Sequence, residues 1–99
     1  MERGGSVYII TNKPNGVLYT GVTSNLQARI IEHQEGKYAG SFSDQYNLKK
    51  LVFFESFSTI EEAIDFEKFV KGKIRQWKLD LIESKNPNWI DLSQEVLRW

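Results

Sequence analysis

The sequence has no cysteine, a single histidine and only two prolines. Without cysteine, the chain cannot form disulfides, thiolate zinc sites or a cysteine nucleophile. One histidine also excludes a metal site built from several imidazoles. Any bound metal is therefore expected to be a hard cation such as Mg²⁺ or Mn²⁺, held by oxygen ligands.

Long apolar runs are also missing. No stretch reaches the roughly 18 apolar residues of a membrane span, and residues 1–5 lack the apolar run of a signal peptide. We therefore expect a cytoplasmic protein that does not bind membranes. Hydrophobic residues make up 40% and aromatic residues 13% of the 99 positions, which is typical of one globular domain.

The charges balance, with thirteen basic and thirteen acidic residues. Nucleic-acid-binding domains are commonly basic overall, so this balance weighs against an obligate tight binder. The distribution is uneven, because residues 68–78 contain five basic and no acidic side chains. This run is either a solvated helix face or a phosphate-binding surface. The nucleic-acid-binding candidates within it are Lys68, Lys71, Lys73 and Arg75.

The order of elements predicts an α+β fold. Runs of β-branched and aromatic residues predict three strands, at residues 6–11, 17–22 and 51–57. Apolar periodicity and capping residues predict helices at about 24–35, 58–71, 73–83 and 91–97. Segment 36–47 is expected to be an irregular loop. Together these elements predict a small antiparallel sheet with helices packed on it.

The first two predicted strands form a hairpin. A four-residue loop at 13–16 would place Ile10 opposite Tyr19, so that Tyr8 and Tyr19 share one face of the sheet. Gly16 is expected to take the left-handed position at the end of this turn. Capping boxes are predicted at the starts of the first two helices, from Ser24 with Gln27 and from Ser58 with Glu61.

Polar residues interrupt the apolar stripe of the first helix. Arg29 and His33 follow the same spacing as Leu26 and Ile30, so both belong to the stripe that should face the sheet. A buried arginine needs a partner. The two side chains are therefore either functional or lie at the edge of the stripe and reach water.

Glu67 lies at the centre of an apolar stripe in the second long helix, formed by Ile60, Ala63, Ile64, Val70 and Ile74. A carboxylate there costs several kcal/mol unless it is paired, protonated or bound to a cation. The structural alternatives are an ion pair with Arg29 or a rotated helix that exposes Glu67. The functional interpretation is a metal-binding carboxylate at the rim of a polar cleft.

Two tyrosines, an arginine, a histidine and a glutamate together favour phosphodiester hydrolysis. That reaction uses a metal, a cation that stabilises the developing charge, and a base that activates water. The sequence offers no persuasive Ser-His-Asp or Cys-His arrangement, and a glycosidase would need two carboxylates in one cleft.

The same residues resemble the GIY-YIG nuclease superfamily over about residues 6–71. Ser6-Val7-Tyr8 and Leu18-Tyr19-Thr20-Gly21 are similar to its two signature tripeptides, although Ser6-Val7 and Thr20 depart from them. Segments 23–33 and 62–71 resemble the helices that carry the family's arginine, histidine and glutamate. Segment 86–92, Asn-Pro-Asn-Trp-Ile-Asp-Leu, resembles the tail of small standalone bacterial members.

The resemblance implies a three-stranded antiparallel sheet flanked by helices, in one nuclease domain over residues 1–99 with a helical extension at about 73–97. It implies an endonuclease of DNA repair or processing with one Mg²⁺ or Mn²⁺ ion. Carried over by position, Glu67 would hold the metal and Arg29 the phosphate. Tyr8 or His33 would be the base, and Tyr19 would either orient or react.

This chain departs from the family pattern at some positions. Val22 stands where many members carry a lysine or other polar group, and the family's late asparagine has two candidates, Asn86 and Asn88. Family members usually gain specificity from attached DNA-binding domains. A domain of this size would need branched or distorted DNA, a protein partner or oligomerisation.

A second hypothesis is a non-catalytic module on the same fold that binds nucleic acid or protein. A third is an inert domain with a structural arginine–glutamate network, which predicts that Glu67→Ala destabilises the protein.

Overall fold

The computed structural model describes residues 4–35 and 46–99, so the expected loop at 36–47 lies almost entirely outside the described part. Three strands form one antiparallel sheet in the order β2-β1-β3: β1 (Gly5–Thr11), β2 (Leu18–Thr23) and β3 (Lys50–Phe57). The helices within the described residues are α1 (Leu26–Gln34), α3 (Ile60–Lys71), α4 (Arg75–Lys85) and α5 (Ser93–Leu97). The predicted three-stranded α+β fold is thus confirmed.

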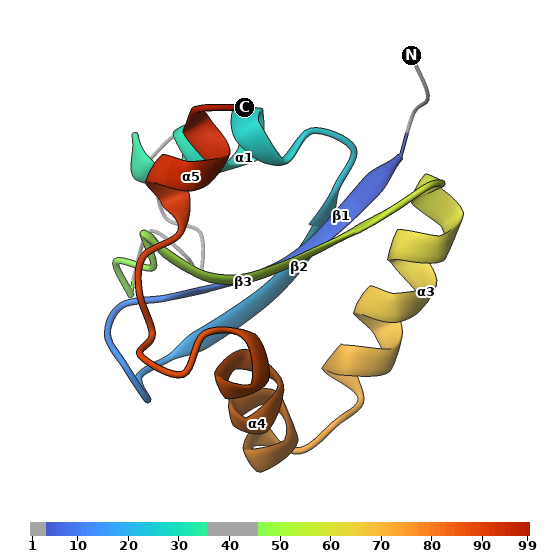
Figure 1. Cartoon of the computed structure of the whole chain (residues 1–99). Helices are drawn as coiled ribbons and strands as arrows, with labels where there is room; N and C mark the ends of the chain where they lie inside the picture. The colour runs from blue at the N-terminus through green and yellow to red at the C-terminus, as the bar shows by residue number, and fades with distance from the viewer. Residues whose placement is uncertain (1–3, 36–45) are drawn as a thin grey trace.

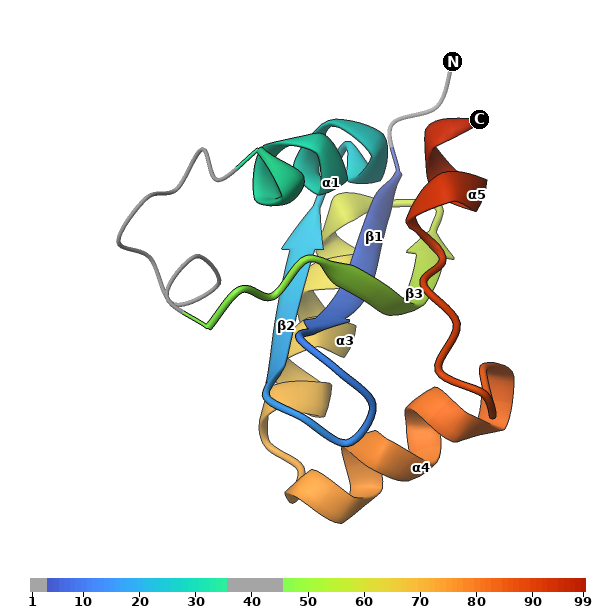
Figure 2. The same ribbon diagram turned by 90° about the vertical axis from the view of Figure 1, so that its left-hand side faces the viewer.

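The sheet is the middle layer of the molecule. Helices α1 and α5 lie over one face, and α3 and α4 lie over the other (Figures 1 and 2). The central strand β1 supplies both cores: Tyr8 and Ile10 pack with α1 and α5, whereas Ile9 packs in the cluster that includes Ile82 of α4. This alternation follows from the two-residue period of a strand.

The β1–β2 hairpin has the predicted register. Ile10 pairs with Tyr19 and Tyr8 pairs with Gly21, so the two tyrosines share a face. The turn corrects one prediction, because Asn15 and not Gly16 takes the left-handed conformation, with φ of 58°. Glycine is needed at position 16 for another reason: a side chain there would collide with the side-chain oxygen of Asn12, which accepts a hydrogen bond from the Val17 backbone amide.

Both predicted helix caps are displaced by one residue. Helix α1 is capped by Asn25, whose side chain accepts a hydrogen bond of 3.0 Å from the Ala28 amide. Ser24 is therefore not the cap. Helix α3 is capped by Thr59, which accepts from the Glu62 amide at 3.2 Å. Neighbouring serine, threonine and asparagine residues have similar capping strength, so the sequence alone did not distinguish them.

The segment after α4 is attached firmly to β3. The side chain of Asn86 donates to the carbonyls of Val52 and Ile90, at 3.0 and 2.9 Å, and accepts from the Ile90 amide at 3.0 Å. Farther along, a carboxylate oxygen of Asp91 accepts from the Leu51 amide at 3.1 Å. These bonds place α5 against α1. None of the helices described is long and apolar enough to cross a membrane.

Candidate active site around strand β2

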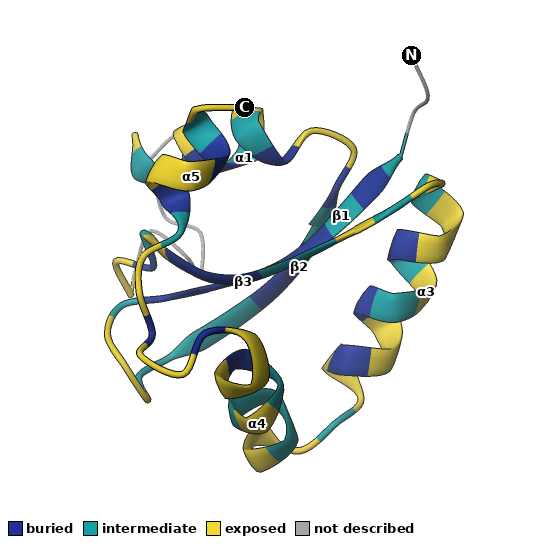
Figure 3. Ribbon diagram, in the orientation of Figure 1, coloured by how far each residue is buried: buried dark blue, intermediate teal, exposed yellow. Residues whose placement is uncertain are grey.

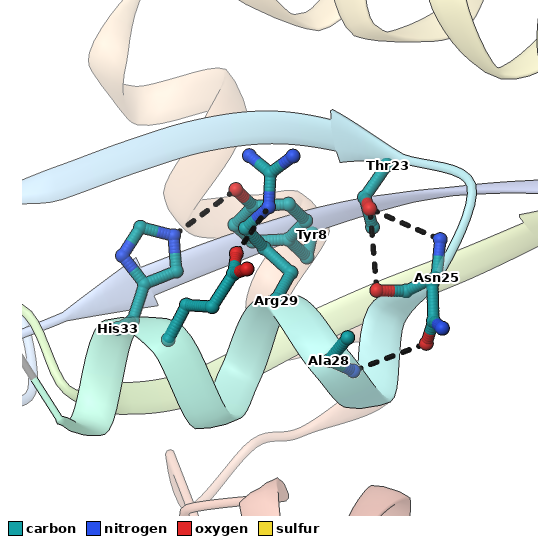
Figure 4. A network of polar contacts seen from close by, with 7 residues as sticks. Tyr8, Thr23, Asn25, Ala28, Arg29 and His33 are labelled. Atoms are coloured by element: carbon teal, nitrogen blue, oxygen red, sulfur yellow. Dashed lines mark hydrogen bonds and ion pairs between the residues drawn. The ribbon is translucent and has the colours of Figure 1, made fainter. Parts of the chain in front are cut away.

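Three aromatic side chains meet on the α1 face of the sheet. The ring of Tyr8 lies 6.5 Å from that of Tyr19 and 5.8 Å from that of His33, and the Tyr19 and His33 rings are 6.2 Å apart. The Tyr8 hydroxyl and His33 Nε2 form a hydrogen bond of 3.2 Å. Figure 4 shows this bond joining β1 to α1. The structure therefore brings together three of the five predicted catalytic residues.

Gly21 makes room for Tyr8. A Cβ at position 21 would lie 2.5 Å from Tyr8 Cζ and closer still to the hydroxyl oxygen, well inside van der Waals contact. Because Gly21 is the cross-strand partner of Tyr8, its missing side chain lets the phenol extend across β2. The signature glycine was noted in the sequence, but its role depends on the pairing register and was not predicted.

His33 is buried, with 8% of its surface exposed. Burial lowers the pKa of His33 below the usual value of 6.5, and the nearby Arg29 cation lowers the pKa further, while Glu32 opposes this shift. The imidazole is therefore neutral near pH 7 and has a lone pair that can accept a proton. The expectation that His33 belongs to the inward stripe of the first helix is confirmed.

Arg29 lies one turn before His33 and is partly exposed. Its Nε is 3.4 Å from a carboxylate oxygen of Glu32. In Figure 4 the Arg29 guanidinium and the Tyr8 hydroxyl point toward the same region beside β2. Glu32 was missed by the sequence analysis, although its position three residues after Arg29 is the usual spacing of a helical ion pair.

Glu67 is buried on α3, with 9% of its surface exposed. It lies between Ala63 and Val70 on the buried band of the helix, which faces the sheet in Figure 3. The alternative of a rotated helix that exposes Glu67 is therefore wrong. The predicted stripe needs one correction, because Ile74 precedes α4 at its N-cap position and is 75% exposed.

The ion pair of Glu67 is formed with Lys71, at 2.7 Å. In the part of the chain that is described, Arg29 pairs with Glu32 and no ion pair joins Arg29 to Glu67. The alternative of a structural Arg29–Glu67 pair is thus wrong. Helices α1 and α3 cover opposite faces of the sheet, so a site that contains both residues must extend around the edge strand β2.

The four nucleic-acid-binding candidates have different surroundings. Lys68 is exposed on α3, whereas Lys71 pairs with Glu67. The ammonium of Lys73 lies 4.4 Å from the Phe69 ring centre. Arg75 donates to the carbonyls of Asn15 and Gly16, at 2.8 and 2.6 Å, and so holds α4 against the hairpin turn.

The late asparagine candidates also differ. The Asn86 side chain is buried and takes part in the three hydrogen bonds that hold the chain to β3. The polar atoms of this side chain are therefore occupied by structural hydrogen bonds. Asn88 is exposed, and it is the candidate with freedom to reach a ligand.

Few of the described side chains around the site could coordinate a metal ion. Across residues 4–35 and 46–99, no group of three or more histidine, aspartate or glutamate side chains is arranged to hold an ion. Glu67 alone is compatible with Mg²⁺, which keeps several waters and often binds through one or two carboxylates together with substrate phosphates. The donor set therefore fits one weakly held ion completed by water and substrate.

The comparisons with known proteins agree with this fold. The model of the GIY-YIG catalytic domain matches residues 4–80, so the chain contains a domain of that class. A UPF0213 protein of Staphylococcus haemolyticus is 42% identical over 79 residues, which cover 80% of this chain and 94% of the relative. One from Vibrio parahaemolyticus is 34% identical over 97 residues, covering 98% of this chain and 90% of the relative.

A solved structure supports the same relationship. The solution NMR structure of the UPF0213 protein BH0048 from Bacillus halodurans superposes with a TM-score of 0.58 at 30% identity, covering 92% of this chain and 95% of that one. The chain belongs to the UPF0213 family of small bacterial proteins. The resemblance to the GIY-YIG superfamily is thereby confirmed.

Proposed function

We propose that this GIY-YIG catalytic domain is a metal-dependent endonuclease that hydrolyses phosphodiester bonds of DNA. The observation that carries the proposal is the Tyr8–His33 hydrogen bond with Arg29 beside it. A phenol that is hydrogen-bonded to a neutral imidazole can accept and transfer protons, and a guanidinium binds and neutralises phosphate oxygens. A module that only binds nucleic acid needs the cation but not the proton-handling pair.

In the proposed reaction, the attacking water loses a proton to the Tyr8 oxygen as the Tyr8 proton passes to His33 Nε2. The water oxygen forms a bond to phosphorus, the bond from phosphorus to the leaving oxygen breaks, and that oxygen takes a proton from solvent. The His33 pKa is lowered by burial, which keeps the imidazole ready to accept this proton near pH 7.

Arg29 binds the phosphate and stabilises its growing negative charge. Tyr19 packs beside Tyr8 and His33 and orients the water. Glu67 would hold the divalent ion, which would supply Lewis-acid stabilisation of the phosphate oxygens. The neutral overall charge predicts few phosphate contacts and weak, salt-sensitive binding of DNA.

The test incubates wild type and Glu67→Gln with labelled linear, flapped and branched DNA, in Mg²⁺, in Mn²⁺ or in chelator. Glutamine keeps the volume of the buried side chain, and circular dichroism verifies that both proteins are folded. We expect wild type to cleave DNA only with metal, and the variant to lose this activity. Binding without cleavage by folded wild type would favour the non-catalytic module, and equal cleavage by both proteins would refute the role of Glu67.

A further inference from the structure

The ion pair between Glu67 and Lys71 has two unequal partners. The side chain of Glu67 is 11% exposed and faces the sheet, whereas that of Lys71 is 50% exposed. Lys71 follows Glu67 by four residues, so its ammonium reaches the carboxylate from one turn farther along α3. The 2.7 Å contact therefore balances the charge of a buried acid with a cation that comes from the solvent side.

This partner can be replaced at little cost. An ion pair with a half-exposed lysine contributes at most about 1 kcal/mol, because water solvates the freed ammonium and the flexible stem regains conformational freedom. Leaving the Glu67 carboxylate unpaired would cost more free energy, because a buried charge needs a counter-charge. A divalent cation offers that counter-charge with a stronger preference for carboxylate oxygen.

We propose that Lys71 is an exchangeable counterion of Glu67, which neutralises the carboxylate in the metal-free protein and competes with the divalent ion for the same oxygen. The inference rests on the proposed function, because it takes Glu67 as the metal-binding carboxylate. It gives Lys71 a role different from the direct phosphate contact expected of the basic run 68–78. Lys71 acts on the metal through Glu67 and is thus a positioning residue.

Competition predicts that removal of the Lys71 charge strengthens metal binding in the absence of DNA. In Lys71→Met, the ion no longer displaces a cation, so we expect Mn²⁺ to bind about two- to fivefold more tightly than to wild type. Lys68→Met is the matched control, because it removes the same charge from an exposed position on the same helix. We expect its Mn²⁺ affinity to stay within about twofold of wild type, because Lys68 points to solvent on the exposed face of α3 and the ion-pair contact with the Glu67 carboxylate belongs to Lys71.

The measurement titrates Mn²⁺ alone into each folded protein and follows water proton relaxation. Lys71→Arg, which keeps the charge, should bind Mn²⁺ like wild type. In a Glu67→Gln background, Lys71→Met should no longer change the affinity for Mn²⁺. Unchanged or weaker binding by Lys71→Met would overturn the inference, as would an equal gain in Lys68→Met. A second variant, Lys71→Gln, repeats the test should Lys71→Met fail to fold.

Failure of this inference is distinguishable from failure of the proposed function. DNA cleavage that depends on metal and Glu67, together with unchanged Mn²⁺ affinity in Lys71→Met, would refute the counterion role alone. Absence of any Glu67-dependent Mn²⁺ binding in wild type would overturn both.

Discussion

Substitution of Gly21 by alanine tests how the site is assembled. The added Cβ would lie 2.5 Å from Tyr8 Cζ, and Tyr8 is fully buried between β2 and α1, so either the phenol or the strand must move. Overpacking of this kind costs about 1–3 kcal/mol. Movement of the phenol also weakens its hydrogen bond to His33, worth about 1 kcal/mol, while alanine regains about 0.5–1 kcal/mol of strand stability over glycine.

The net loss expected for Gly21→Ala is about 2 kcal/mol in the free energy of unfolding. For a domain of this size, that loss corresponds to a fall of about 8–16 °C in Tm. Urea unfolding followed by circular dichroism measures the free energy directly. Gly72→Ala is the matched control, because a Cβ at Gly72 would have its nearest neighbour at 3.6 Å. We expect that control to be neutral or slightly stabilising.

A double-mutant cycle identifies Tyr8 as the cause. Leucine at position 8 lacks the ring atoms and hydroxyl that the new Cβ would meet. The penalty of Gly21→Ala should therefore shrink in a Tyr8→Leu background, with a coupling free energy of about 1–2 kcal/mol. A full penalty in that background, or wild-type stability of Gly21→Ala itself, would refute the close approach of Tyr8 to β2.

Three further predictions concern stability. Asn86→Ala removes three hydrogen bonds at a buried position and should cost about 2–3 kcal/mol by urea unfolding, whereas exposed Asn88→Ala should stay within about 0.5 kcal/mol. Asn25→Ala removes the cap of α1 and should lower the free energy of unfolding by about 1 kcal/mol, whereas Ser24→Ala should not lower it. A larger loss in Ser24→Ala than in Asn25→Ala would identify Ser24 as the cap. The folded-state pKa of His33 lies below its unfolded value of 6.5, so the unfolded chain binds the extra proton and the free energy of unfolding should fall as the pH drops below 6.5. Urea unfolding measured across this pH range should show a flatter dependence for His33→Gln than for wild type. Parallel curves for the two proteins would exclude His33 as the source.

Much of the site could be predicted because local patterns determine it. A turn of fixed length sets the hairpin register, and this register places Tyr8 and Tyr19 on one face. The buried positions of His33 and Glu67 match their places in the apolar periodicity of the two helices, which favoured the inward interpretation. These predictions needed no knowledge of how distant segments pack.

The errors arose where neighbouring residues compete or where packing decides. Asn15 and Gly16 both tolerate the left-handed region, and Asn25 and Ser24 both cap helices, so single positions could not be assigned. The sequence allows Arg29 and Glu67 to be partners because both fall on the apolar stripes of their helices. Their helices cover opposite faces of the sheet, and Arg29 pairs with Glu32 on α1 whereas Glu67 pairs with Lys71 on α3.

We propose that residues on both faces of the sheet form one metal-dependent site around the edge of β2. The most direct measurement adds a small amount of Mn²⁺ to isotopically labelled protein and maps the paramagnetic broadening of amide resonances. We predict the strongest broadening around Glu67 on α3 and along β2, extending to His33 on α1, and its loss in Glu67→Gln. Broadening centred on another acidic cluster, such as Glu61 and Glu62, or broadening unchanged in Glu67→Gln, would contradict the account.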